Sequence, residues 1–324
     1  MRPDEIWDGE SPKARVLRLV LTPLSWLYAL GWESYLAVYR LGLKKAKEPH
    51  PNVICIGSLL VGGSGKSPLT IHLVRVLQSL GKQVVIGSSG YGAPHSKEAS
   101  LAPMGALRAS EWGDEPSMFR WLLPDIPQVV GRRRVLAAQL VQDTFPGSVL
   151  LMDDGFQHLP LKKRIQLLLV DPKIRNRMCL PAGPHREPHW NRKRADLIIP
   201  DVYQVVSRPM VLVNQEGGEE KPAQYAVICA LGQPTRFLAA LREHFPNQLS
   251  DPPVILLQDH DPLLGPDLWK SIPDELAIVV TSKDWVKIRD RSDVSERVFL
   301  IARQEVTLEP QDEFRNWLAK KLDE

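Results

Sequence analysis

The sequence predicts an α/β protein with a doubly wound, mostly parallel sheet. Short apolar runs recur from residue 52 onward, segments with helical periodicity separate them, and several runs end in Asp. Strands that are apolar almost throughout are buried on both faces, which indicates a parallel sheet with helices on each side. Ligands in such folds bind at the carboxyl ends of the strands, so the polar residues found there are the candidate site residues.

The predicted elements fall into two sets. After the first strand, Leu69, Leu73 and Leu80 recur at helical spacing and Gly81 ends the helix. The polar, Gly-rich stretch 214–224 is the best linker candidate before the second set. The predicted strands are 52–58, 83–89, 148–154, 165–171, 195–201 and 209–214, then 223–232, 253–259, 276–282 and 297–302; helices are predicted at 67–81, 234–245 and 311–322.

The length and composition fit a globular protein with one large or two medium domains. The chain has 324 residues, of which 44% are hydrophobic and 24% charged. We expect an N-terminal apolar segment (1–48), a larger α/β domain (49–216) and a smaller one (217–324). The three cysteines form no C-x-x-C motif, which is typical of inert thiols in a reducing compartment.

The formal net charge is only +3, but basic residues cluster at 131–134, 162–164 and 191–194. These clusters fit either solvated loops or the binding of an anionic ligand or membrane surface. No basic stripe with interleaved aromatic residues and no zinc-finger spacing occurs, so we expect no nucleic-acid partner.

The apolar segment 16–43 is interrupted by Arg18, Pro23 and Glu33, so it lacks the roughly twenty uncharged residues of a spanning helix. It also lacks the features of a secretory signal. Two interpretations remain: an amphipathic helix packed on the core, or an interfacial helix on a membrane. In the second, aromatic residues lie at headgroup depth and lysines face anionic lipid: Trp26, Tyr28, Trp32, Tyr35, Lys44, Lys45 and Lys47.

The stretch LLVGGSGKSP, residues 59–68, has the strand–loop–helix context of a P-loop and predicts an NTPase-like fold that binds a nucleotide. Leu60 stands where the usual pattern has its first Gly, and we expect the Gly62–Gly63 pair to compensate. Lys66 would reach the β- and γ-phosphates, and Ser67 would bind Mg²⁺. The predicted nucleotide-binding residues are Gly62, Gly63, Ser64, Gly65, Lys66 and Ser67.

A P-loop needs an acidic residue at a strand end to hold Mg²⁺, and Asp153 has this position after four apolar residues. Asp154 beside it would either support the metal site as a neighbouring acid or orient the acceptor, and Asp171 is a weaker alternative to Asp153. The string TSKD at 281–284 has the wrong spacing for the N-K-x-D of a GTPase. The motifs therefore predict a P-loop hydrolase or kinase.

Seven strings occur in the order seen in one family, and they extend over most of the chain after PLSWLY (23–28). They are VGGSGKSP, SSGYG, GDEP, DDGFQH, LPAGPHREP, QDHD and TSKDWVK. The chain thus resembles the tetraacyldisaccharide 4′-kinases, the lipid A 4′-kinases of Gram-negative bacteria. The resemblance implies an ATP- and Mg²⁺-dependent lipid kinase at the cytoplasmic face of the inner membrane. Its acceptor would be the 4′-hydroxyl of an acylated glucosamine disaccharide 1-phosphate, its product lipid IVA, and a P-loop without the first Gly is usual in the family.

The resemblance also assigns roles to residues. It implies that Asp114 is the catalytic base and that His260 works with it, while Lys66, Ser67 and Asp153 keep their P-loop roles. Further polar or substrate-binding residues of the site would be Tyr91, Glu115, Arg134, Asp154, Gln157, His158, Arg186 and Glu187.

This sequence departs from the family pattern at Ser89, where Arg is usual, and at His185 and Asp261. Neighbouring arginines (132–134) could supply the cation missing at Ser89. Two other functions use the same P-loop: an ATPase that switches a membrane-bound partner, and a membrane-bound nucleotide sensor. Neither needs the Asp114–His260 pair, because a carboxylate beside a His serves to accept a hydroxyl proton.

Overall fold

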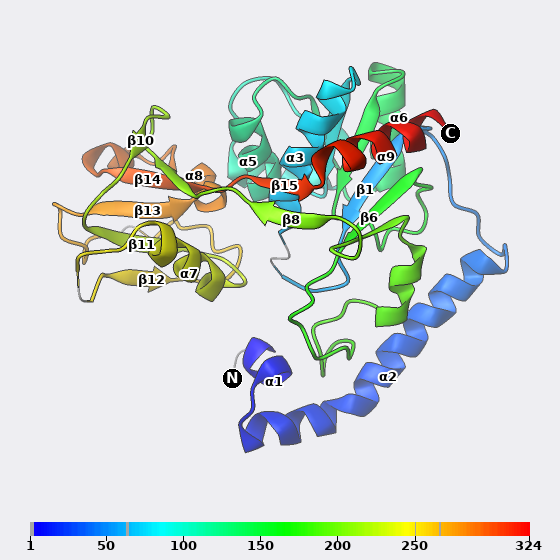
Figure 1. Cartoon of the computed structure of the whole chain (residues 1–324), viewed down its shortest axis with the longest axis horizontal. Helices are drawn as coiled ribbons and strands as arrows, with labels where there is room; N and C mark the ends of the chain where they lie inside the picture. Colours follow the sequence, from blue (N-terminus) through cyan, green and yellow to red (C-terminus); the bar gives the residue numbers. More distant parts are fainter. Residues whose placement is uncertain (1–2, 63–64, 250, 266) are drawn as a thin grey trace.

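The computed structural model describes residues 3–62, 65–249, 251–265 and 267–324, which contain two larger sheets joined by a two-stranded ribbon (Figure 1). Among these residues, seven strands form the first sheet, in the order β3-β4-β2-β5-β1-β6-β7, and only the β3–β4 pair is antiparallel. The strands are β1 (Val53–Gly57), β2 (Val84–Ser88), β3 (Ser100–Leu101), β4 (Gln128–Val130), β5 (Val149–Asp153), β6 (Ile165–Leu169) and β7 (Leu197–Ile199). The predicted mostly parallel α/β fold is confirmed.

Helices cover both faces of this sheet because alternate residues of each buried strand point to opposite sides. Ile54 and Ile56 of β1 belong to the apolar cluster with α3, α5 and α9, whereas Val53 and Cys55 belong to the cluster with α6. The helices of this P-loop domain are α3 (Lys66–Ser79), α4 (Ala109–Trp112), α5 (Asp114–Leu122), α6 (Arg134–Thr144) and α9 (Gln311–Asp323), with short 3₁₀ turns at Pro94–Ser96 and His189–Arg194.

A second domain is built on the other large sheet, with strand order β10-β9-β14-β13-β11-β12 in the described part of the chain. Its helix α7 packs through Leu241 on one face, and α8 packs through Trp285 and Ile288 on the other. The elements are β9 (Val211–Val213), β10 (Glu219–Glu220), β11 (Tyr225–Cys229), α7 (Pro234–His244), β12 (Val254–Leu256), β13 (Ala277–Thr281), α8 (Ser282–Ile288), a 3₁₀ turn (Ser292–Glu296) and β14 (Phe299–Arg303).

The two domains are joined differently from the expectation. β8 (Gln204–Ser207) pairs antiparallel with β15 (Val306–Glu309), so the chain enters and leaves the second domain through one ribbon (Figure 1). The stretch 214–224, expected to be a linker, lies within the second domain, where Asn214 organises the turn between β9 and β10. The expected boundary at 216 therefore falls inside a hairpin.

Helix α9 also lies elsewhere than expected, because it returns to the P-loop domain and packs beside α3 (Figure 1). Phe314 and Leu318 are fully buried there, in the same apolar cluster as Leu73 and Leu77 of α3. The helical periodicity of residues 311–322 shows an apolar face but does not show which domain that face covers.

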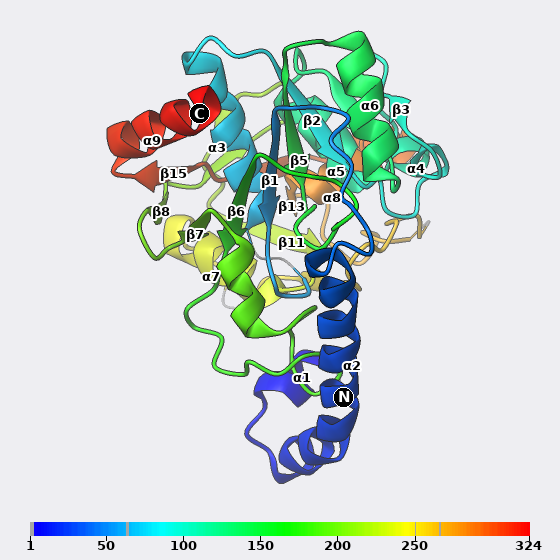
Figure 2. The same cartoon turned by 90° about the vertical axis from the view of Figure 1, so that its right-hand side faces the viewer.

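The N-terminal helices α1 (Pro3–Asp8) and α2 (Pro12–Arg40) extend away from both sheets (Figures 1 and 2). The Ser11 side chain caps α2 by accepting a hydrogen bond from the backbone N–H of Ala14 at 3.2 Å. In the part of the chain that the structure describes, no helix combines the length and the apolar character needed to cross a membrane.

Since α9 completes the core of the P-loop domain, truncating its central side chain should destabilise the protein. We expect Phe314→Ala to lower the free energy of unfolding by about 3–5 kcal/mol, because it leaves a cavity in a packed core. The exposed Lys320 of the same helix provides a control, and Lys320→Ala should change stability by less than about 0.5 kcal/mol. Urea titration followed by circular dichroism measures both values. Equal stability of the two variants would contradict the packing of α9 described here.

Candidate active site

The Gly-rich loop connects β1 to α3 at the carboxyl edge of the first sheet. Gly65 precedes α3 with φ of 77°, and Lys66 is the first residue of the helix. Gly62 also has a positive φ of 92°. These backbone angles are strained for residues that carry a Cβ, which explains glycine at both positions. Gly63 and Ser64 lie outside the described residues.

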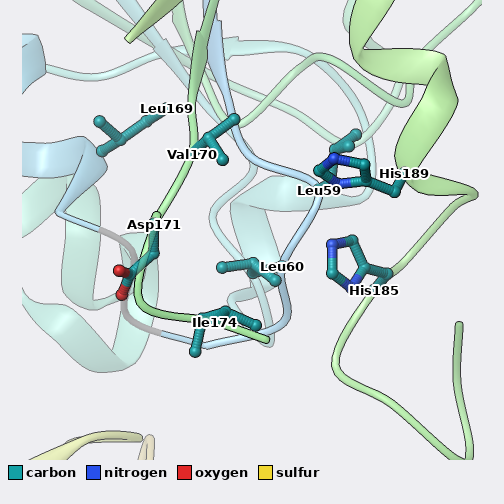
Figure 3. A pocket seen from close by; sticks show the side chains of 8 residues that line it. All are labelled: Leu59, Leu60, Leu169, Val170, Asp171, Ile174, His185 and His189. Atoms are coloured by element: carbon teal, nitrogen blue, oxygen red, sulfur yellow. The ribbon is translucent and has the colours of Figure 1, made fainter. Parts of the chain in front are cut away.

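Leu60, where the usual pattern has Gly, has a structural role of its own. Its neighbour Val61 donates a backbone hydrogen bond to the carbonyl of Pro184 (2.9 Å), and Arg186 donates one to the carbonyl of Leu59 (2.7 Å). Segment 59–61 therefore runs beside 184–186. The buried Leu60 side chain lines a small cavity of mixed character, together with Ile174 and His185 (Figure 3).

Two acids end β5 and have different environments. Asp153 is 2% exposed; its Oδ1 accepts a hydrogen bond from Thr70 Oγ1 at 3.1 Å, and its Oδ2 is buried without a hydrogen-bond partner in the described structure. Burial, reinforced by the charge of Glu115, raises the pKa of Asp153 to about 7. A buried carboxylate oxygen that lacks a hydrogen-bond partner is suited to bind a cation.

Asp154 is held ionised by cations. It has a left-handed φ of 53° and forms a two-bonded pair with Arg186, at 2.8 and 3.0 Å, while Lys66 Nζ lies 3.8 Å from its Oδ2. Burial opposes ionisation, yet Lys66 and Arg186 hold the pKa of Asp154 below its usual value. The alternative acid Asp171 instead pairs with Arg236 of α7.

A network of largely buried polar side chains lies beside Asp153 and Asp154. Gln157 Nε2 donates to the Ser58 carbonyl (3.0 Å) and to Glu187 Oε1 (2.9 Å). Glu187 is fully buried, and both its oxygens accept from Arg194, at 2.8 and 2.6 Å. Burial raises the pKa of Glu187 despite this partner. Arg134, 4% exposed, donates to the carbonyl of Asp153 at 3.1 Å.

His158 lies in the same region, and its carbonyl accepts a hydrogen bond from Lys163 at 2.7 Å. Burial, together with the nearby charges of Lys163 and Arg134, lowers the pKa of His158 to about 4. The imidazole is therefore neutral near pH 7.

Asp114 and His260 come together from different domains. Asp114 begins α5 in the P-loop domain, and its Oδ2 lies 3.1 Å from Nδ1 of His260 in the second domain. Burial opposes ionisation of Asp114, but the hydrogen bond from His260 and the charge of Lys287 lower its pKa. Lys283 Nζ lies 3.4 Å from Nε2 of His260. The carboxylate is thus ionised and oriented by a His, as a proton acceptor requires.

Tyr91 lies next to His260 of the Asp114–His260 pair, with 71% of its surface exposed. Its ring lies 5.8 Å from the His260 ring and 5.5 Å from the Arg132 guanidinium. A Cβ on Gly113 would meet the Cα of Gly90 at 3.2 Å, so the SSGYG and GDEP loops pack backbone against backbone. This close approach brings Tyr91 and Asp114 to the same side of the site.

The sequence reasoning did not single out Arg194, Lys283 or Lys287. Arg194 belongs to a basic cluster that fits a solvated loop equally well. Its partner Glu187 lies in LPAGPHREP, but only the structure shows that this acid is buried and therefore needs a cation. Lys283 and Lys287 lie within TSKDWVK. Apart from the local contact between Lys287 and Asp284, their partners are at least 23 residues away in sequence. When the partner of a buried ion lies far away in the chain, no short sequence motif identifies the pair.

A Gly-rich loop with Lys66 at a helix N-terminus, an acidic strand end and a carboxylate–His pair define this molecule as a P-loop kinase or hydrolase. A family model described as tetraacyldisaccharide-1-P 4′-kinase matches residues 17–323, and the chain belongs to this family. The resemblance found in the sequence is thereby confirmed.

Individual relatives agree. A tetraacyldisaccharide 4′-kinase of Shewanella sediminis is 33% identical over 289 residues, which cover 85% of this chain and 84% of that protein. Another, of Geobacter metallireducens, is 34% identical over 255 residues, covering 71% and 75%. The crystal structure of LpxK from Aquifex aeolicus in complex with ATP matches with a TM-score of 0.78 and 26% identity, covering 94% of this chain and 99% of that one.

The raised pKa of Asp153 predicts a pH effect on stability in metal-free buffer. Between about pH 4 and 7 the folded protein retains a proton at Asp153 that the unfolded chain has lost, so this group lowers stability as pH rises through that window. We expect Asp153→Asn to become more stable relative to the unsubstituted protein up to about pH 7, with no further gain above it. Urea unfolding in EDTA at several pH values measures the difference.

The exposed Asp290 supplies the control for this comparison. Asp290→Asn also removes one carboxyl group, but from the protein surface, so it reports any general effect of losing a negative charge. A pH-independent difference for Asp153→Asn would show that its carboxyl ionises normally in the folded protein.

Proposed function

We propose that the protein transfers the γ-phosphate of ATP to the 4′-hydroxyl of tetraacyldisaccharide 1-phosphate and so produces lipid IVA. Membership of the tetraacyldisaccharide-1-P 4′-kinase family supports the reaction and the acceptor. The observation that carries the mechanism is the 3.1 Å contact between Asp114 and His260, because a protein that only hydrolyses or senses ATP has no need for a base directed at an alcohol.

The Gly-rich loop and the N-terminus of α3 would hold the phosphates of ATP. Backbone N–H groups of Gly62 and Gly65 would face the phosphate oxygens, and Lys66 would neutralise the charge that develops on the transferred group. Ser67 and Asp153 would hold Mg²⁺, and the buried, unpartnered Oδ2 of Asp153 fits that role. When bound, Mg²⁺ supplies charge to orient and polarise the phosphates.

Asp114 would accept the proton of the 4′-hydroxyl. Its lowered pKa keeps the carboxylate ionised near neutral pH, and the hydrogen bond to His260 fixes its orientation. Because the two residues belong to different domains, closure of the second domain over the first completes the pair. Exclusion of water from the closed site would favour transfer to the lipid over hydrolysis.

The other polar residues divide by exposure. The exposed Tyr91 would contact the sugar of the acceptor, and Arg186 with Asp154 lies beside Lys66. Of the remaining members, Arg134 would position Asp153 through the carbonyl of that residue. Gln157 and Glu187, which bind each other, would hold the backbone at Ser58. Glu115 would act on Asp153 through its charge, and His158 would contribute a neutral imidazole.

Helix α2 would lie on the cytoplasmic surface of the inner membrane. One side of it is attached to the site, because Tyr28 Oη donates to the Arg186 carbonyl (2.9 Å) and Glu33 accepts from Trp190 (2.9 Å). The other side exposes a band of large apolar residues, including Val16, Leu19, Val20, Leu24, Trp26, Leu27 and Leu30. Such a band beside lysines 44 and 45 is typical of an interfacial helix.

The kinase proposal is tested with labelled ATP and the acylated disaccharide 1-phosphate in detergent micelles. We expect label in the lipid, and we expect Asp114→Ala to lower kcat by about 10²–10⁴-fold with ATP binding retained. Asp312→Ala, at an exposed position on α9, should leave kcat unchanged. Release of free phosphate without labelled lipid would instead support an ATPase that switches a partner.

The membrane proposal is tested without disturbing the contacts of Tyr28 and Glu33. Leu19, Leu27 and Leu30 are each more than 60% exposed, so replacing all three with Gln should leave the fold intact. We expect the affinity for vesicles of anionic phospholipid, measured by sedimentation, to fall at least tenfold, since each leucine buried in the membrane contributes about 1.5–3 kcal/mol. Leu264→Gln, at an exposed apolar residue of the second domain, serves as the control. Unchanged sedimentation of the triple variant would exclude this face as the membrane contact.

A further inference from the structure

We propose that Lys287 is a positioning residue that holds both members of the Asp114–His260 pair in place. This inference rests on the proposed function, because it assigns a role toward the base of the phosphotransfer reaction. It arises from the TSKDWVK string, which the nucleotide site and the acceptor site leave unexplained.

Lys287 lies on α8 of the second domain with its side chain only 2% exposed. Its ammonium group has three oxygen neighbours: Asp261 O at 3.0 Å, Asp284 Oδ1 at 3.2 Å and Asp114 Oδ2 at 3.6 Å. A buried ammonium is costly unless such acceptors surround it, so its position is set by these groups. His260 Nδ1 contacts the same Asp114 oxygen, so both described partners bind Oδ2, and Oδ1 would face the hydroxyl of the lipid.

The contact between Lys287 and the Asp261 carbonyl helps to fix the backbone turn that contains His260. His260 has a positive φ of 63°, an unfavourable conformation for a residue with a side chain. Strain of this kind persists only where surrounding contacts impose it. Lys287 holds the carbonyl of the next residue, and the Asp261 carboxylate accepts from the Leu263 N–H at 2.8 Å. The turn is therefore fixed from α8, the helix that packs against α5.

Asp284 fixes Lys287 in turn. It is fully buried, and its Oδ2 accepts from Thr281 Oγ1 (2.8 Å) and from the Ala230 N–H (3.2 Å), which leaves Oδ1 for Lys287. The chain of contacts runs from the core of the second domain through Asp284 and Lys287 to Asp114 in the P-loop domain. Lys283, one turn earlier on α8, contacts Nε2 of His260. The same face of α8 therefore contacts His260 through Lys283 and Asp114 through Lys287.

The test compares three variants of the full-length protein in the lipid phosphorylation assay. Lys287→Met alone leaves Asp284 buried without its cation, so the informative variant is Lys287→Met with Asp284→Asn, which removes both charges. Asp284→Asn alone keeps Lys287 beside Asp114. Lys270→Met removes one exposed lysine from the same domain and serves as the charge control. Thermal unfolding and ATP binding establish that each variant is folded.

We expect the double variant to lose on the order of 10²-fold in kcat with an unchanged KM for ATP, because the base is misplaced while the nucleotide site is intact. Lys270→Met should stay close to the unsubstituted kcat. Asp284→Asn should lose less than the double variant, because Lys287 keeps its contacts with Asp261 and Asp114. The acidic limb of the pH–rate profile should move to higher pH in the double variant, because Asp114 then faces only His260 and Lys283 among the charged partners that lower its pKa.

The inference is overturned if the folded double variant keeps its kcat, or if kcat falls with no movement of the acidic limb. It is also overturned if Asp284→Asn alone reproduces the whole effect, since the loss would then come from the core of the second domain. An unsubstituted protein that labels no lipid would refute the proposed function itself, and the inference with it.

Discussion

The pair between Arg186 and Asp154 is the interaction on which the rest of the site depends. Arg186 binds both oxygens of Asp154 at the end of β5, donates to the Ser58 carbonyl after β1, and accepts the hydroxyl of Tyr28 on its own carbonyl. One residue thus connects two strand ends and helix α2. Because Asp154 also pairs with Lys66, the charge of the P-loop lysine is balanced in the same group of contacts.

The site combines two kinds of support. Within the P-loop domain, ion pairs such as that of the buried Glu187 with the largely buried Arg194 hold backbone segments in place, and their opposite charges compensate each other. Across the domain boundary, the Asp114–His260 contact depends on how two separately packed sheets meet. The first kind of support lies within the P-loop domain, whereas the second joins the two domains.

Much of the fold could be predicted from local patterns. Apolar runs identify β1, β2, β5 and β6, and the Gly-rich loop with Lys66 identifies the nucleotide-binding strand and helix, because these signals lie within a few consecutive residues. The destination of α9, the hairpin at 214–224 and the partner of Glu187 could not be predicted, since each depends on which distant surface is available after folding. The roles of Asp114 and His260 came from family resemblance, and the structure adds their proximity.

The paired strands β8 and β15 have a consequence for the order of folding during synthesis. The second domain is inserted between them, and α9 follows it in the chain. On the ribosome, the entire insert must therefore be made before Phe314 and its neighbours can cover α3. The P-loop domain, although it is encoded first, keeps an open apolar face until the insert has emerged. The later domain can complete its own core earlier, so translation order and folding order are reversed for this part of the molecule.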